Sequence, residues 1–158
     1  MSNAWILVSD AAKARLFEMA RPSHALVEIA CFTNLDGRGA SRKGLGRRLP
    51  RAKDSLGSAR RAIEPHKTWR EKHALQFAKS LKKALINGQA HHQFERLFLV
   101  APPRFLGVLH ESLDDHLAAQ VAGEIGNDLI ALRPNDLLDR LHVAFPHDFR
   151  AQPAHAAM

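Results

Sequence analysis

The sequence has a single cysteine and no long apolar run, and each absence excludes a class of protein. Cys31 alone cannot form an internal disulfide or a multi-cysteine zinc site. No apolar stretch approaches the roughly 18 residues that a membrane-spanning helix needs. The opening residues, MSNAWILVSD, lack a basic region followed by a long apolar segment, so they do not resemble a secretory signal. We therefore expect a cytoplasmic protein without a membrane span.

Residues 38–61 lack aromatic side chains, and their net positive charge exceeds that of the entire chain. This run holds nine Arg or Lys residues and one acid, Asp54, for a charge of +8. The other 134 residues hold 14 basic and 15 acidic side chains, so their charge is only −1. Such segregation indicates an anionic partner, most often nucleic acid or an anionic membrane surface. The alternative is a solvated loop without a partner.

The basic run predicts a particular way of binding RNA. Arginine side chains can fork onto phosphates, and the glycines of the run let the backbone approach an RNA surface. The lack of aromatic residues argues against stacking on bases, so we expect recognition of phosphates and shape, as in structured RNA. The residues expected to contact nucleic acid are Arg38, Arg42, Lys43, Arg47, Arg48, Arg51, Lys53, Arg60 and Arg61.

Apolar periodicity divides the rest of the chain into strands and then helices. Alternating or continuous apolar runs predict three strands at 4–10, 12–19 and 25–34, joined as an antiparallel meander. Later segments alternate between helix and strand, which predicts parallel neighbours joined by helical crossovers. These segments are a helix from Thr68 to Gly88, a strand at 94–101, a helix carrying Phe105 to Leu117, a short strand at 120–125 and a helix near 135–142.

The helix starting at Thr68 is expected from a capping box, Thr68-x-x-Glu71, and Gly88 is expected to stop it. The pattern as a whole predicts an α/β fold with a mixed five-stranded sheet and helices on its faces. The apolar positions of the central strands and of the facing helices are predicted to be buried together. They are Ile6, Val8, Phe17, Phe77, Leu81, Phe98, Val100, Leu109 and Leu113.

Three segments, WILVSDAAKARLFE, LFLVAPPRFLGVLHESL and EIGNDLIALRPNDLLDRL, resemble the bacterial family of host attachment proteins. That family is similar to the middle domain of the archaeal and eukaryotic class-1 translation release factor. The resemblance implies a ribonuclease-H-like fold with sheet order 3-2-1-4-5 and a long basic loop after the third strand. It implies one domain over residues 1–145, with the basic loop at 37–65 and a flexible tail at 146–158.

In the release factor, the corresponding loop carries Gly-Gly-Gln at its catalytic tip. This sequence has no Gly-Gly-Gln between the third strand and the long helix, and its nearest approximation, Asn87-Gly88-Gln89, lies at the other end of that helix. The resemblance to the release factor therefore includes the position and charge of the loop but not its catalytic tip.

Other side chains give no convincing catalytic constellation. Asp10, Asp114 and Asp115 are interpreted as surface carboxylates, with a two-metal nuclease as the alternative. The ten histidines include no pair of the HExxH type, so we expect them to be solvated and expect no metal or cofactor. Cys31 is interpreted as a small core residue rather than a nucleophile.

The function predicted from these features is a non-enzymatic RNA-binding or ribosome-associated module. Two alternatives stay open: an adhesion or host-attachment protein, as the family name implies, and a hydrolase or nuclease of unknown substrate. Neither the RNA target nor the oligomeric state follows from the sequence.

Overall fold

The computed structural model describes residues 3–20, 24–34 and 55–149, with the backbone alone over 55–68. Five strands form one sheet: β1 (Ala4–Ser9), β2 (Lys13–Met19), β3 (Leu26–Thr33), β4 (Arg96–Val100) and β5 (Val121–Ile125). The strand order is β3-β2-β1-β4-β5, as expected from the family resemblance. Strands β1 to β3 pair antiparallel, whereas β4 and β5 continue the sheet in parallel with β1. This arrangement is ribonuclease-H-like.

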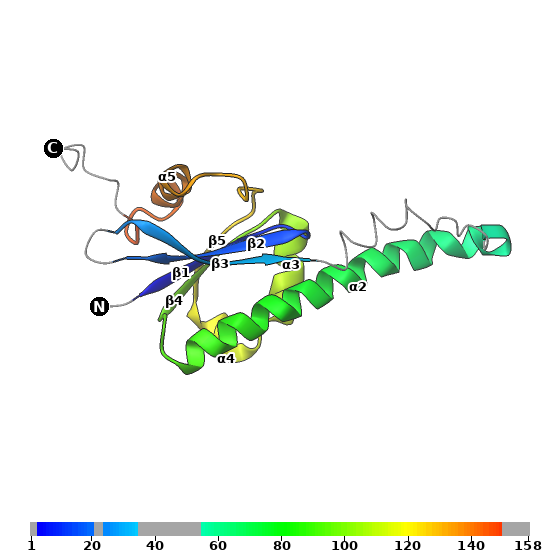
Figure 1. The fold of residues 1–158 in the computed structure, drawn as a ribbon, viewed down its shortest axis with the longest axis horizontal. Coiled ribbons are helices and arrows are strands. Elements are labelled where there is room, and N and C mark those ends of the chain that lie inside the picture. The colour runs from blue at the N-terminus through cyan, green and yellow to red at the C-terminus, as the bar shows by residue number, and fades with distance from the viewer. Residues whose placement is uncertain (1–2, 21–23, 35–54, 150–158) are drawn as a thin grey trace.

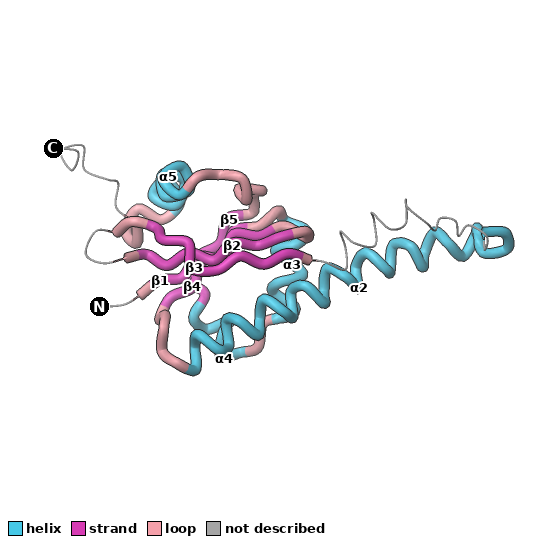
Figure 2. The backbone as a smooth tube through the Cα atoms, in the orientation of Figure 1, coloured by secondary structure: helices cyan, strands magenta, loops and turns pink. Residues whose placement is uncertain are grey.

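Helices cover both faces of the sheet (Figures 1 and 2). One face carries α2 (Ser55–Ala90), α3 (Pro103–Ser112) and α4 (Asp115–Gln120), and the other carries α5 (Pro134–Ala144). Strand β1 lies at the centre, and all six of its residues are buried, as a near-continuous apolar strand between two helical layers requires.

The core predicted as one group is in fact divided by the sheet. Successive side chains of a strand point to opposite faces, so Trp5 and Leu7 pack beneath α2 while Ile6 and Val8 pack beneath α5. Of the predicted core residues, those on the α2 face are Phe77, Leu81 and Leu109, with Leu113 only partly buried there. Those on the α5 face are Ile6, Val8, Phe17, Phe98 and Val100.

Helix α2 begins at Ser55, 13 residues before the expected capping box at Thr68. The last part of the loop predicted at 37–65 is therefore helical. The segment 59–64, ARRAIE, consists mostly of strong helix formers, and the helix runs through Pro65, although a proline inside a helix is unfavourable by about 3 kcal/mol relative to alanine. The helix ends at Ala90, two residues beyond Gly88.

The helix predicted to carry Phe105 to Leu117 is instead two helices, α3 and α4. Asp114 separates them, because its side chain accepts a hydrogen bond from the backbone N–H of Leu117 (2.9 Å) and caps α4. His110 and Asp114 therefore do not lie on one helix.

Two further expectations need correction. Cys31 is exposed rather than in the core, because β3 is an edge strand with most of its residues outside the packed layers. The tail predicted to start at residue 146 is packed up to Phe149, whose side chain is fully buried. His142 Nδ1 lies 2.6 Å from the Phe149 carbonyl, and Asp148 pairs with Arg96 at 2.5 Å, so the packed chain extends four residues beyond 145.

Candidate functional site

The residues predicted to contact nucleic acid fall into two groups. Arg60 and Arg61 lie in helix α2, at positions where the backbone alone is described. The other seven, Arg38, Arg42, Lys43, Arg47, Arg48, Arg51 and Lys53, lie outside the described residues.

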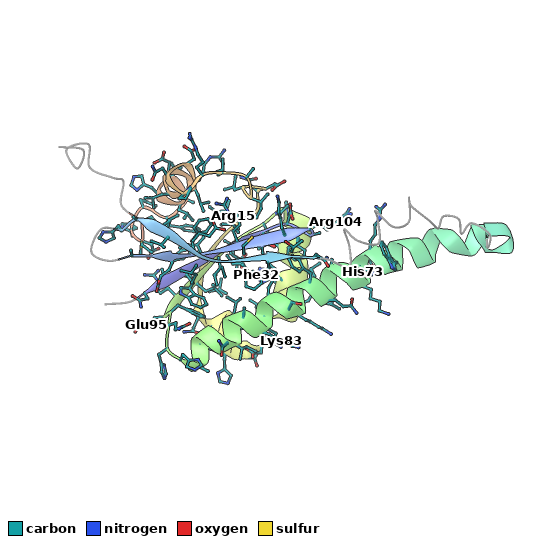
Figure 3. All side chains as sticks on the ribbon, viewed as in Figure 1. Arg15, Phe32, His73, Lys83, Glu95 and Arg104 are labelled. Atoms are coloured by element: carbon teal, nitrogen blue, oxygen red, sulfur yellow. The ribbon has the colours of Figure 1, made fainter. Side chains whose placement is uncertain are left out.

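Helix α2 continues the basic run into the folded part of the protein. One face of the helix packs on the sheet through the buried side chains of Phe77, Leu81 and Leu85. The opposite face carries Lys72, Lys79 and Lys83, all exposed. Their spacing of seven and four residues places them on one side of the helix, over about 16 Å of its length. Figure 3 shows Lys83 on the side of α2 away from the sheet.

The charge of the chain is more strongly segregated than the run at 38–61 alone indicates. Residues 38–90 contain 15 basic and three acidic residues, for a charge of +12. The remaining 105 residues contain eight basic and 13 acidic residues, for a charge of −5. A basic segment that includes α2 is therefore attached to an acidic body. The sequence contains this signal, but the predicted contact residues ended at Arg61, and the chain from Thr68 onward was assigned to a separate helix.

The N-terminal part of α2 extends away from the sheet (Figure 1). A helix of 36 residues is about 54 Å long, whereas the longest strand, with eight residues, spans about 26 Å. From Phe77 onward, several side chains of α2 are buried against the body. Residues 69–72, before this packed part, are all exposed. We call residues 55–72 the α2 arm. The arm projects the start of the helix beyond the surface of the body.

An aromatic pair lies where the arm meets the body. The ring centroids of Trp69 and His73, one helical turn apart, are separated by 4.2 Å at an interplanar angle of 57°. Trp69 is exposed, with 37% of its surface accessible. His73 is half-buried, and its Nδ1 atom is buried with no hydrogen-bond partner. This pair was not predicted from the sequence, because residues 38–61 were expected to form the whole site.

The three carboxylates considered for catalysis are not brought together as a metal site. Asp10 Oδ1 accepts hydrogen bonds from the backbone N–H groups of Ala12 and Lys13, both 2.8 Å, and so holds the turn between β1 and β2. Asp114 caps α4, and Asp115 is exposed in its first turn. Within residues 3–20, 24–34 and 55–149, no three His, Cys, Asp or Glu side chains are grouped so that they could hold a metal ion.

The histidines on the body make local contacts. His91 and His92 are both exposed after α2, and His91 Nδ1 lies 2.8 Å from the Asn87 carbonyl. His110 Nε2 lies 2.6 Å from Glu124 Oε2, which joins α3 to the edge strand β5. These contacts belong to the fold, and they assemble no catalytic arrangement.

The sheet order and its helical layers define the protein as a ribonuclease-H-like α/β domain. Residues 5–141 match the family described as "Protein required for attachment to host cells", and the chain belongs to that family. No curated protein matches the sequence. Over the part of the chain that the structure describes, no helix is both long enough and apolar enough to cross a membrane.

Among solved structures, the chain is similar to the Ppx/GppA phosphatase of Aquifex aeolicus in its type II variant. The two share 16% sequence identity, with a TM-score of 0.35. The match covers 79% of this chain but 35% of the phosphatase chain, so this protein spans about a third of that one's length.

Proposed function

We propose that this protein is a non-enzymatic, cytoplasmic module that binds structured RNA, such as that of the ribosome. The basic run at 38–61 and the lysine face of α2 would form its binding surface. The observation that carries the proposal is the separation of charge between residues 38–90, at +12, and the rest of the chain, at −5. A basic stripe on an acidic body is the footprint of a protein that binds a polyanion in one orientation.

The geometry of α2 supports this proposal. The backbone of the arm extends away from the sheet (Figure 1), so an RNA could approach the arm without meeting the acidic body. Lys72, Lys79 and Lys83 contribute little to packing, because each is exposed on the face opposite the core. The resemblance to the release-factor middle domain also supports it, since a basic segment occupies the same place between the third strand and the long helix.

Direct binding measurements with a structured RNA test the proposal. The lysine-face variant, Lys72→Gln with Lys79→Gln and Lys83→Gln, should bind more weakly. The slope of log K against log salt should become less steep by roughly 0.7–0.9 for each phosphate that the variant no longer neutralises. The matched control removes three charges from the acidic body, through Arg104→Gln, Arg133→Gln and Arg140→Gln, all exposed. Equal weakening in the two variants would show that binding depends on net charge and has no defined surface.

A second candidate is attachment to a host cell, which the description of the family supports. The two functions require different locations. Fractionation should find the protein in the cytoplasm, bound to material that ribonuclease treatment releases. Recovery from the cell surface, with no bound RNA, would reject the RNA-binding proposal and favour attachment.

A further inference from the structure

Trp69 differs from the other tryptophan of this chain, Trp5, in its exposure to solvent. Trp5 is 5% exposed and stacks on Phe94 with ring centroids 4.7 Å apart, as a core residue does. Trp69 is 37% exposed and lies in the α2 arm. Among the described side chains, it is the only aromatic residue in the group of exposed large hydrophobics, which also contains Val27, Ile29, Ile86 and Val143.

The surroundings of Trp69 are cationic. Lys72 lies three residues on and so shares the side of the helix that carries the indole, whereas Arg70, the next residue in the sequence, projects about 100° further around the helix axis. Both are exposed, and Glu71 is the only acidic residue in α2 from residue 69 onward. Phosphates attracted to these cations would bring the attached bases to the indole. An aromatic face beside cations is the arrangement with which proteins hold unpaired nucleotides.

His73 supports the indole from one side. Its ring is tilted against Trp69 at 57°, and its Nδ1 is buried without a hydrogen bond, which costs stability. A polar ring placed at such a cost is not explained by packing of the core. A platform, in which His73 holds the indole in place, would account for it.

We propose that Trp69, backed by His73, stacks on an unpaired base of the bound RNA, while Lys72, on the same side of the helix, contacts a neighbouring phosphate. This inference rests on the proposed RNA-binding function and adds a base-recognising element to it. It also revises the expectation of recognition through phosphates and shape alone, because the aromatic residue absent from 38–61 is supplied by the helix that continues the run.

The test uses two RNA hairpins that differ only in the loop, one with its bases and one with abasic positions. The wild-type protein should bind the hairpin with bases more tightly, by roughly 5- to 150-fold, which is the range of one base–aromatic stack. Trp69→Ala should remove this preference and leave the salt dependence of binding unchanged. Trp69→Phe should restore most of it. Ile86→Ala, a change at a site that is 36% exposed on the same helix, should keep the full preference.

Tryptophan fluorescence gives a second measurement. The hairpin with bases should quench the wild-type emission, and Trp69→Phe, which retains only the buried Trp5, should show no such change. A Trp69→Ala protein that still prefers the hairpin with bases would overturn the stacking inference and leave RNA binding intact. Failure of the wild type to bind either hairpin would overturn the proposed function itself. Equal binding of inorganic polyphosphate and both hairpins would reject base recognition and assign the surface to polyanions in general.

Discussion

Gly88 lies directly against the indole of Trp5. A Cβ atom at position 88 would approach the Trp5 ring closer than 3.0 Å, which real Cβ atoms do not do. The glycine was expected to stop the helix, but α2 continues to Ala90 and Gly88 has no left-handed backbone conformation. Its role is therefore to let the end of α2 approach strand β1. Contact at this point fixes how the long helix sits on the sheet.

Gly88→Ala should lower the free energy of unfolding by about 1–3 kcal/mol, because the added methyl group overpacks a core that cannot yield easily. The better helix propensity of alanine offsets only part of this change. Gly107→Ala is the matched control, since a Cβ there would meet nothing within 4 Å. That change in α3 should stabilise the protein by about 0.5–1 kcal/mol in urea unfolding. Similar effects of the two substitutions would contradict the contact with Trp5.

Asp114 should contribute to stability through its cap rather than through its charge. Asp114→Ala removes the bond to the Leu117 N–H and should cost about 1 kcal/mol, as for other N-caps. Asp114→Asn keeps an acceptor and should cost much less. Asp115→Ala, one residue later, makes no such cap and should change the unfolding free energy by only a few tenths. Equal effects at 114 and 115 in thermal unfolding would show that the charge, and not the cap, is responsible.

Arg15 should contribute more to the free energy of unfolding than its ion pair with Glu28 alone does. Its Nη1 donates to the carbonyls of Ile130 (2.9 Å) and Leu132 (2.7 Å), while Nη2 lies 3.0 Å from Glu28 Oε1. Arg15→Lys removes the forked donors, so it should cost about 1–3 kcal/mol. Glu28→Gln removes only a partly exposed pair and should cost less than about 1 kcal/mol. Urea unfolding of the two variants distinguishes these roles, and a larger effect of Glu28→Gln would refute this order.

Phe149 should anchor the end of the packed chain. Its side chain is fully buried against Phe98, with ring centroids 4.7 Å apart. Phe149→Ala should cost about 3–5 kcal/mol, as for other buried phenylalanines. Val143→Ala, in the preceding helix at 78% exposure, should change little. A small effect at 149, measured by calorimetry, would restore the expectation that the tail begins at 146.

The strands could be predicted from sequence because local apolar patterns define them. Their order came from the family resemblance and not from periodicity. The errors lie where a local signal competed with tertiary structure. Thr68 and Glu71 form a capping box in sequence, yet helix formers upstream extend α2 to Ser55. Phe149 follows a proline in a polar segment, so nothing local marks its burial against Phe98.

The candidate site was only partly predictable for a related reason. The distribution of charge located the basic run at 38–61, because charge is additive along the sequence. That Lys72, Lys79 and Lys83 belong to the same surface depends on one helix joining them to the run. The exposure of Trp69 likewise depends on where α2 leaves the body. A helical pattern alone gives no indication of that position.

The last prediction concerns Arg47, Arg48 and Arg51, which lie outside the described residues. If about five phosphates are neutralised by the basic run, log K for RNA should fall with log salt at a slope of roughly −3.5 to −4.5. Replacing the three arginines by glutamine should flatten that slope by about 2 to 3 units. The melting temperature should change little, because a segment with so little apolar surface cannot offset the entropy of ordering its chain. If the triple variant bound RNA with unchanged affinity, the binding site would lie on the lysine face of α2 and not on the basic run. A large drop in stability would instead mean that the fold itself requires these charges.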